Sequence, residues 1–150
     1  MSNQPATVRH HAAASQAAVW DVLADGWTYA SWVVGASRVR DVDANWPQVG
    51  SRLHHSFGVW PLVINDRTEV LESEPGSRLL LKARGWPTGE ATVNITIAGL
   101  GPRESLLSIE EDATAGPALA IPQSIRQTLT VPRNKEALRR LGLLAAGRQI

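Results

Sequence analysis

The feature of this sequence that most constrains its fold is a long stretch in which apolar and polar residues alternate. It extends over residues 37–112 and is clearest in residues 91–99, where Val93, Ile95 and Ile97 alternate with Thr and Asn. An alternation with a period of two is typical of β-strands that bury one face. Turn-forming Gly and Pro residues interrupt the pattern at roughly ten-residue intervals. The stretch therefore predicts an antiparallel sheet of about six to seven strands with one covered face.

The segments on either side of this stretch show helical spacing instead. Ser15 is placed to cap a helix over residues 16–25, and residues 27–33 are expected to form a second short helix or turn. Near the end of the chain, residues 133–148 carry the strongest helical pattern, with Leu on one face and Lys and Arg on the other. Pro132 precedes this segment and is expected to break or kink whatever lies before it.

The order of these elements predicts an α+β fold. A first strand is expected at residues 6–12, followed by the two short helices, the antiparallel strands and the long C-terminal helix. We expect one domain over residues 1–150, with its core at residues 6–147 and its curved sheet wrapped around the last helix. A helix laid against a strongly bent sheet need not fill the space between them, and such interiors are common ligand sites.

The absence of cysteine and of several motifs excludes many kinds of site. The chain has no Cys, which rules out disulfides, thiolate metal sites and cysteine nucleophiles. It also lacks the GxSxG, Walker, Rossmann and HExxH motifs. We therefore expect no metal and no cofactor. No apolar run is long enough for a membrane span and the N-terminus does not resemble a signal peptide, so we expect a cytoplasmic protein.

The charge distribution bears on possible partners. The net charge of +1 provides no general attraction for nucleic acid, which we do not expect as a partner. Residues 126–150 are locally basic, however, with six Lys and Arg residues and one Glu. These side chains are interpreted as the solvated face of a helix, and the alternative is a docking surface for an acidic partner. The chain itself is expected to be a monomer or a homodimer.

The element order resembles the helix-grip superfamily, which includes START lipid-transfer domains and the polyketide cyclase/dehydrase group (SRPBCC). The resemblance is carried by "AAVWDVLADGWTYASWVVGASRVRDVDANWPQVGSRLHHSFGVWP", by "TEVLESEPGSRLLLKARGWPTGEATVNITI", by "IEEDATAGP" and by "RNKEALRRLGLLA". It implies the helix-grip fold over nearly the whole chain. It does not imply a specific activity, because this superfamily contains carriers, receptors and enzymes and no catalytic motif can be matched here.

The resemblance places the two short helices near the entrance of a cavity, where aromatic side chains are concentrated. Trp27, Tyr29 and Trp32 lie within six positions of one another, and these side chains either seal the seam between helix and sheet or line the cavity. The full set of candidate ligand-binding residues is Trp27, Trp32, His55, Phe57, Trp60, Trp86, Val93, Ile95 and Leu141.

Three polar residues are candidates for chemistry in such a cavity. His55 alternates with Leu53 and Phe57 and so is expected to point inward, where it would be either an ordinary hydrogen-bonded core residue or a general base. Glu111 continues an inward-facing series. It is either solvated at the rim of the sheet or buried, and in the second case His55 or an Arg such as Arg84 would be its natural partner. Tyr29 completes the set of weak catalytic candidates.

Three functional hypotheses follow. The first is a protein that binds a small hydrophobic molecule, such as a lipid, a polyketide or an aromatic metabolite, between the sheet and the last helix. The second is an enzyme of the polyketide cyclase/dehydrase type, which requires at least two inward polar groups within reach of each other. The third is an interaction module that uses the basic C-terminal helix, and it predicts a filled interior.

Overall fold

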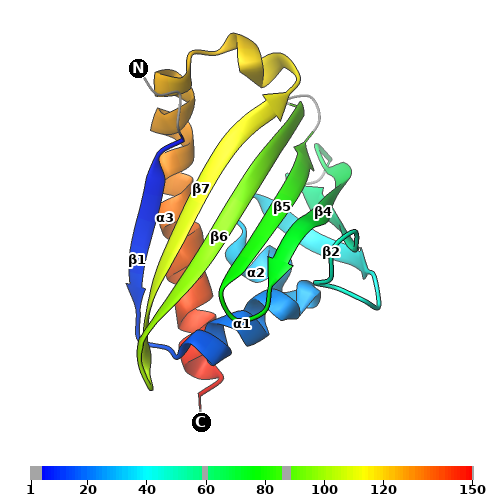
Figure 1. The fold of residues 1–150 in the computed structure, drawn as a ribbon. Helices are drawn as coiled ribbons and strands as arrows, with labels where there is room; N and C mark the ends of the chain where they lie inside the picture. Colours follow the sequence, from blue (N-terminus) through cyan, green and yellow to red (C-terminus); the bar gives the residue numbers. More distant parts are fainter. Residues whose placement is uncertain (1–4, 59–60, 86–88, 150) are drawn as a thin grey trace.

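The computed structural model describes residues 5–58, 61–85 and 89–149, and its elements follow the expected order (Figure 1). In chain order these elements are β1 (Thr7–Ala12), α1 (Gln16–Ala24), the 3₁₀ helix η1 (Gly26–Thr28), α2 (Tyr29–Trp32), β2 (Ala36–Val42), β3 (Arg52–Phe57), β4 (Ile64–Glu74), β5 (Arg78–Gly85), β6 (Gly89–Gly101), β7 (Glu104–Ala115), the 3₁₀ helix η2 (Pro117–Ala120) and α3 (Gln123–Gly147).

The seven strands form one antiparallel sheet in the order β1-β7-β6-β5-β4-β3-β2. In Figure 1 the sheet is strongly twisted, α3 lies against one of its faces, and α1 crosses the lower end of the molecule. Helix α3 contacts β1, β7, α1 and α2. This arrangement confirms the helix-grip fold, with one sheet face covered by helices and the other facing solvent.

The alternation along the strands has the expected consequence for burial. On β5, Leu79 and Leu81 are buried, and on β6 Ile95 and Ile97 are buried, whereas their neighbours in the sequence are partly exposed. Leu79 is paired with Ile95 in the register of the two strands, so the apolar side chains line up on one face. Burying such aligned side chains is the main stabilising contribution of a one-sided sheet.

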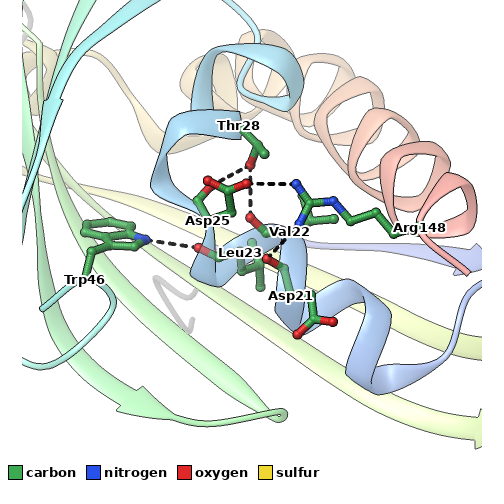
Figure 2. Close-up of polar contacts among 7 residues, drawn as sticks. All are labelled: Asp21, Val22, Leu23, Asp25, Thr28, Trp46 and Arg148. Atoms are coloured by element: carbon green, nitrogen blue, oxygen red, sulfur yellow. Dashed lines mark hydrogen bonds and ion pairs between the residues drawn. The ribbon is translucent and has the colours of Figure 1, made fainter. Parts of the chain in front are cut away.

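The C-terminal end of α1 is held by side chains from other segments (Figure 2). The last carbonyl groups of a helix have no partner within it. In α1, the carbonyl oxygen of Leu23 accepts a hydrogen bond from the indole Nε1 of Trp46 at 3.0 Å, and that of Val22 accepts one from the hydroxyl of Thr28 at 2.9 Å. At the other end, the Ser15 hydroxyl accepts from the backbone N–H of Ala18, which confirms the expected cap.

The end of α3 is tied to the same place. The guanidinium of Arg148 donates to the carbonyl oxygen of Asp21 at 3.3 Å and forms an ion pair of 2.9 Å with the carboxylate of Asp25 (Figure 2). Arg148 follows α3, Asp21 belongs to α1 and Asp25 is the residue after it. These contacts therefore hold the C-terminal ends of the two helices together.

Helix α3 is longer than the sequence predicted. It begins at Gln123 and continues through Pro132, so the expected break at this proline is wrong. Pro132 is exposed, and water can therefore satisfy the carbonyl group of Thr128 that a proline cannot bond. All the buried residues of α3 follow this proline, and they are Asn134, Ala137, Leu138, Leu141, Gly142 and Ala145.

Two strand ends also differ from the sequence prediction. The alternation of apolar and polar residues over 51–60 predicts one strand there, but β3 ends at Phe57, where Gly58 adopts a φ of +93° that interrupts the extended backbone. Strand β7 continues to Ala115, three residues beyond its predicted end. Among the described residues, no helix has both the length and the apolar character needed to cross a membrane.

Candidate functional site

A cavity of about 420 Å³ lies between the sheet and α3. One wall is mostly apolar and comes from α2 and the strands, with Tyr29, Trp32, Phe57, Leu81, Val93 and Ile109 as its main contributors. The other wall is mostly polar and comes from α3 and the end of β7, with Glu111, Arg126, Gln127, Thr130, Arg133 and Asn134. The volume is in the range of pockets that hold small organic ligands.

The cavity lies toward one end of the sheet. Its lining includes Ala83 near the end of β5, Ala113 near the end of β7, and Ala118 and Ile121 in the connection to α3. In Figure 1 these segments lie at the upper end of the molecule, away from α1. The end near α1 is filled instead by fully buried side chains such as Val19 and Leu53.

The structure places several of the predicted residues in the cavity wall. Trp32, Phe57 and Val93 line the cavity, as do the weak catalytic candidates Tyr29 and Glu111. These residues come from α2, three different strands and positions up to 82 residues apart in the sequence. The fold therefore gathers side chains that are distant along the chain.

Other predicted residues lie elsewhere. Trp27 is 59% exposed and does not line the cavity, because it lies in η1 with its ring toward solvent. Ile95 and Leu141 are fully buried in the core rather than in the cavity wall. Trp60 and Trp86 lie outside the described residues.

His55 points inward, as predicted, but it is separated from the cavity. It is fully buried and stacks on Tyr29, with ring centroids 5.2 Å apart. Its Nε2 lies 2.9 Å from the hydroxyl of Thr68, and the same hydroxyl lies 3.1 Å from the phenol oxygen of Tyr29. The three side chains form one hydrogen-bonded chain, and only Tyr29 lines the cavity.

Burial determines the protonation states of His55 and Tyr29 in this hydrogen-bonded series. Desolvation lowers the pKa of His55 to about 4, and the negative charge of Asp66 only partly opposes this shift. Desolvation also raises the pKa of Tyr29 to about 12. At neutral pH both side chains are therefore uncharged, and the interpretation of His55 as a hydrogen-bonded core residue agrees with the geometry.

Glu111 is paired with a residue that the sequence did not indicate. Its carboxylate forms an ion pair with Arg133 of α3, whereas Arg84 pairs with Glu90 at 3.0 Å and His55 bonds to Thr68. Burial raises the pKa of Glu111, and the adjacent positive charge of Arg133 opposes this rise without cancelling it. An arginine was one of the expected partners, but the sequence could not indicate Arg133, because the position of α3 against β7 is set by packing and not by any local pattern.

Several residues of the site were missed by the sequence analysis. Arg133 and Asn134 line the cavity, but Arg133 was interpreted as part of a solvated face and Asn134 was given no role, because the expected break at Pro132 hid the continuous helical face. Thr68 is fully buried next to His55, and its position directly opposite Leu53 in the β3–β4 register could have suggested an inward side chain.

The basic segment at the C-terminus is largely neutralised by nearby acids. Arg139 and Arg140 both pair with Glu136 at 2.7 and 3.0 Å, and Arg126 lies 4.0 Å from Asp112. Together with the pairs of Arg133 and Arg148, these contacts engage most of the positive charges of the segment. No group of acidic and histidine side chains within the described ranges is arranged to hold a metal ion.

Comparison with known proteins identifies the fold. No protein-family model and no curated protein sequence matches this chain. Among solved structures, a START superfamily protein from Mycobacterium smegmatis has a TM-score of 0.68 and 15% sequence identity, with 97% of each chain covered. Protein CV1439 from Chromobacterium violaceum has a TM-score of 0.66 and 23% identity, covering 95% of this chain and 99% of that one.

A third similar structure is a larger protein. The di-domain ARO/CYC protein StfQ from the steffimycin biosynthetic pathway has a TM-score of 0.70 and 11% identity, and the match covers 97% of this chain and 52% of StfQ. At these identities the comparisons support a shared START-like, polyketide cyclase-like fold, in agreement with the resemblance in the sequence. They do not transfer a ligand or an activity.

Proposed function

We propose that this protein binds a small, mainly apolar molecule in the cavity between the sheet and α3. The observation that carries the proposal is the cavity itself, about 420 Å³ in volume, with an aromatic and aliphatic wall formed by residues such as Trp32, Phe57 and Val93. Leaving such a space unfilled in a core costs packing energy, which a ligand that occupies it would restore. The START superfamily protein and the ARO/CYC protein with this fold make a bound small molecule a reasonable expectation here.

The open interior and the ion pairs of the basic C-terminal segment favour a binding role over the third hypothesis, an interaction module. That hypothesis requires a filled interior, and most of the basic side chains that it needs are engaged with acids of the same chain. The monomeric or homodimeric state and the cytoplasmic location stay predictions.

The experiment is a titration with N-phenyl-1-naphthylamine, a neutral apolar dye whose emission rises in an apolar site. We expect saturable binding, and we expect Ala91→Phe to weaken it at least tenfold because the new ring enters the cavity from β6. The control is Ala98→Phe on the same strand, where the side chain is exposed and binding should not change. Equal affinity in both variants, or no saturable binding to the wild type, would contradict the proposal.

A second candidate function is proton transfer on the bound molecule, as in an enzyme of the polyketide cyclase/dehydrase type. The observation that favours it is that the hydroxyl of Tyr29 and the carboxylate of Glu111 line one cavity and are close enough for the charge of Glu111 to raise the pKa of Tyr29. His55 would act only through Thr68. If a poly-β-ketone substrate is cyclised, Tyr29→Phe should abolish turnover and leave dye binding intact.

A further inference from the structure

The polar wall of the cavity contains a nearly buried side chain whose hydrogen-bonding capacity is unused. Asn134 is only 5% exposed, and it lines the cavity from α3. Its side-chain amide makes no hydrogen bond to any of the described residues. A polar group that lines a cavity and has no partner within the protein is free to bond to a ligand. Such a group in a cavity wall is therefore suited to a ligand that supplies the missing partner.

Arg133 and Glu111 lie beside this amide and add charge to the same part of the wall. Arg133 precedes Asn134 in α3, and one nitrogen of its guanidinium donates to Glu111. A guanidinium has five N–H donors, so most of its donors remain available after this contact. The side chain of Arg133 is 43% exposed and that of Glu111 is 16% exposed, so the cation is the more accessible member of the pair.

Among the paired carboxylates of the cavity wall, Glu111 lies furthest from the end of β7. Glu111 is opposite Val93 in the β6–β7 register, two positions further from the end of β7 than Ala113. The pairs Arg84–Glu90 and Arg126–Asp112 lie nearer that end. The apolar wall faces Glu111 and Arg133 across the cavity. A ligand held there would therefore place a polar head against α3 and an apolar body against the strands.

We propose that Arg133 and Asn134 bind the carboxylate of an otherwise apolar ligand, which takes over the ion pair that Glu111 makes in its absence. This inference rests on the proposed function and names its ligand class, an amphipathic carboxylic acid. The planar guanidinium binds a carboxylate through two parallel hydrogen bonds, and the amide N–H of Asn134 donates a third. Glu111 then takes a proton from solvent and donates it in a hydrogen bond to the ligand, which avoids two adjacent negative charges.

The test compares two probes that differ only in the head group, decanoic acid and 1-decanol, as competitors of N-phenyl-1-naphthylamine. For the wild type we expect decanoic acid to displace the dye at a concentration at least tenfold lower than 1-decanol. Arg133→Met should weaken decanoic acid at least tenfold and Asn134→Leu about threefold or more, while 1-decanol changes less than twofold. Glu111→Gln should strengthen decanoic acid, because the competing negative charge is gone while a hydrogen-bond donor remains.

The control variant is Arg139→Met, which removes an arginine from the exposed face of the same helix, where it pairs with Glu136. It should leave both probes unchanged. Equal displacement by the two probes in the wild type, or an equal loss for both in Arg133→Met, would overturn the head-group assignment while leaving apolar binding in place. If neither the dye nor 1-decanol binds, the proposed function fails and this inference fails with it. If Arg133→Met does not fold, the displacement of the dye by decanoic acid and by 1-decanol in Asn134→Leu and Glu111→Gln tests the head-group assignment.

Discussion

The two halves of α3 belong to one helix and yet have opposite environments. After Pro132, residues such as Leu138, Leu141 and Ala145 are fully buried or nearly so. Before Pro132 no residue of the helix is buried, and the apolar side chains of Ile125 and Leu129 are 53% and 70% exposed. The second half packs against the covered face of the sheet, whereas the first half lies further from the sheet and forms one side of the cavity.

From Leu138 onward, α3 packs closely in the core and does not line the cavity. A Cβ atom added at Gly142 would lie only 3.2 Å from the Cβ of Ala12 and 3.4 Å from the ring of His10, which shows how closely α3 approaches β1 there. The first half instead contributes Arg126, Gln127 and Thr130 to the cavity wall. The difference teaches that this helix supplies stability with its last turns, from Leu138 on, and the candidate site with the turns before them, Arg133 and Asn134 included.

The largest expected effect comes from placing a charge in the packed half. Leu141→Asp should lower the free energy of unfolding by more than about 4 kcal/mol, because it removes a fully buried side chain and adds an unpaired charge. The matched variant Leu129→Asp, in the open half, should cost less than about 0.5 kcal/mol. Urea unfolding measures both, and similar losses at the two positions would show that the halves do not differ in the way described.

A smaller effect should come from pH, through His55 in the packed region. Its pKa is about 4 in the folded chain and about 6.5 when unfolded, so the unfolded state binds the extra proton first as the pH falls. The stabilising contribution of neutral His55 is therefore complete above pH 6.5 and is lost progressively toward pH 4, by about 3 kcal/mol.

The measurement is the free energy of unfolding at pH 7 and at pH 4, for the wild type and for His55→Gln. The variant should be less stable at pH 7 but should lose less stability on acidification, because glutamine does not titrate. An identical pH dependence in both proteins would mean that His55 is solvated, contrary to its complete burial.

The smallest effect concerns the boundary between the two halves. Pro132→Ala should raise the free energy of unfolding by about 1 kcal/mol, since alanine favours a helix and can bond to the carbonyl group of Thr128. Amide hydrogen exchange should slow in residues 124–131, where the helix has few packing contacts. Unchanged exchange in that segment would mean that Pro132 does not weaken the open half.

Much of the fold could be predicted from the sequence because it depends on local patterns. The period of two placed the strands, and the cap at Ser15 and the Leu stripe of α3 placed the helices, with errors of a few residues at strand ends. Gly58 and Pro132 caused the two larger errors. The end of β3 before Gly58 and the continuation of α3 through Pro132 both depend on the surroundings of these residues, which local propensity does not include.

The candidate site could be predicted only in part. Alternation along β3 and β7 correctly indicated that His55 and Glu111 point inward. It could not indicate that Tyr29 and Thr68 would separate His55 from the cavity, or that Trp27 would turn to solvent. These outcomes depend on how α1, η1 and α2 pack across the sheet, which involves contacts between segments far apart in the chain.

The sequence by itself determined the class of the fold, the order of its elements and the face that each strand buries, because these follow from the spacing of apolar residues along the chain. Only the tertiary structure decided that the space beside the first half of α3 stays open, and that Arg133 meets Glu111 next to an unpaired Asn134. The reason is physical. A cavity and an ion pair across elements depend on the angle and register at which a helix docks on a sheet, and that geometry is set by the packing of many side chains at once.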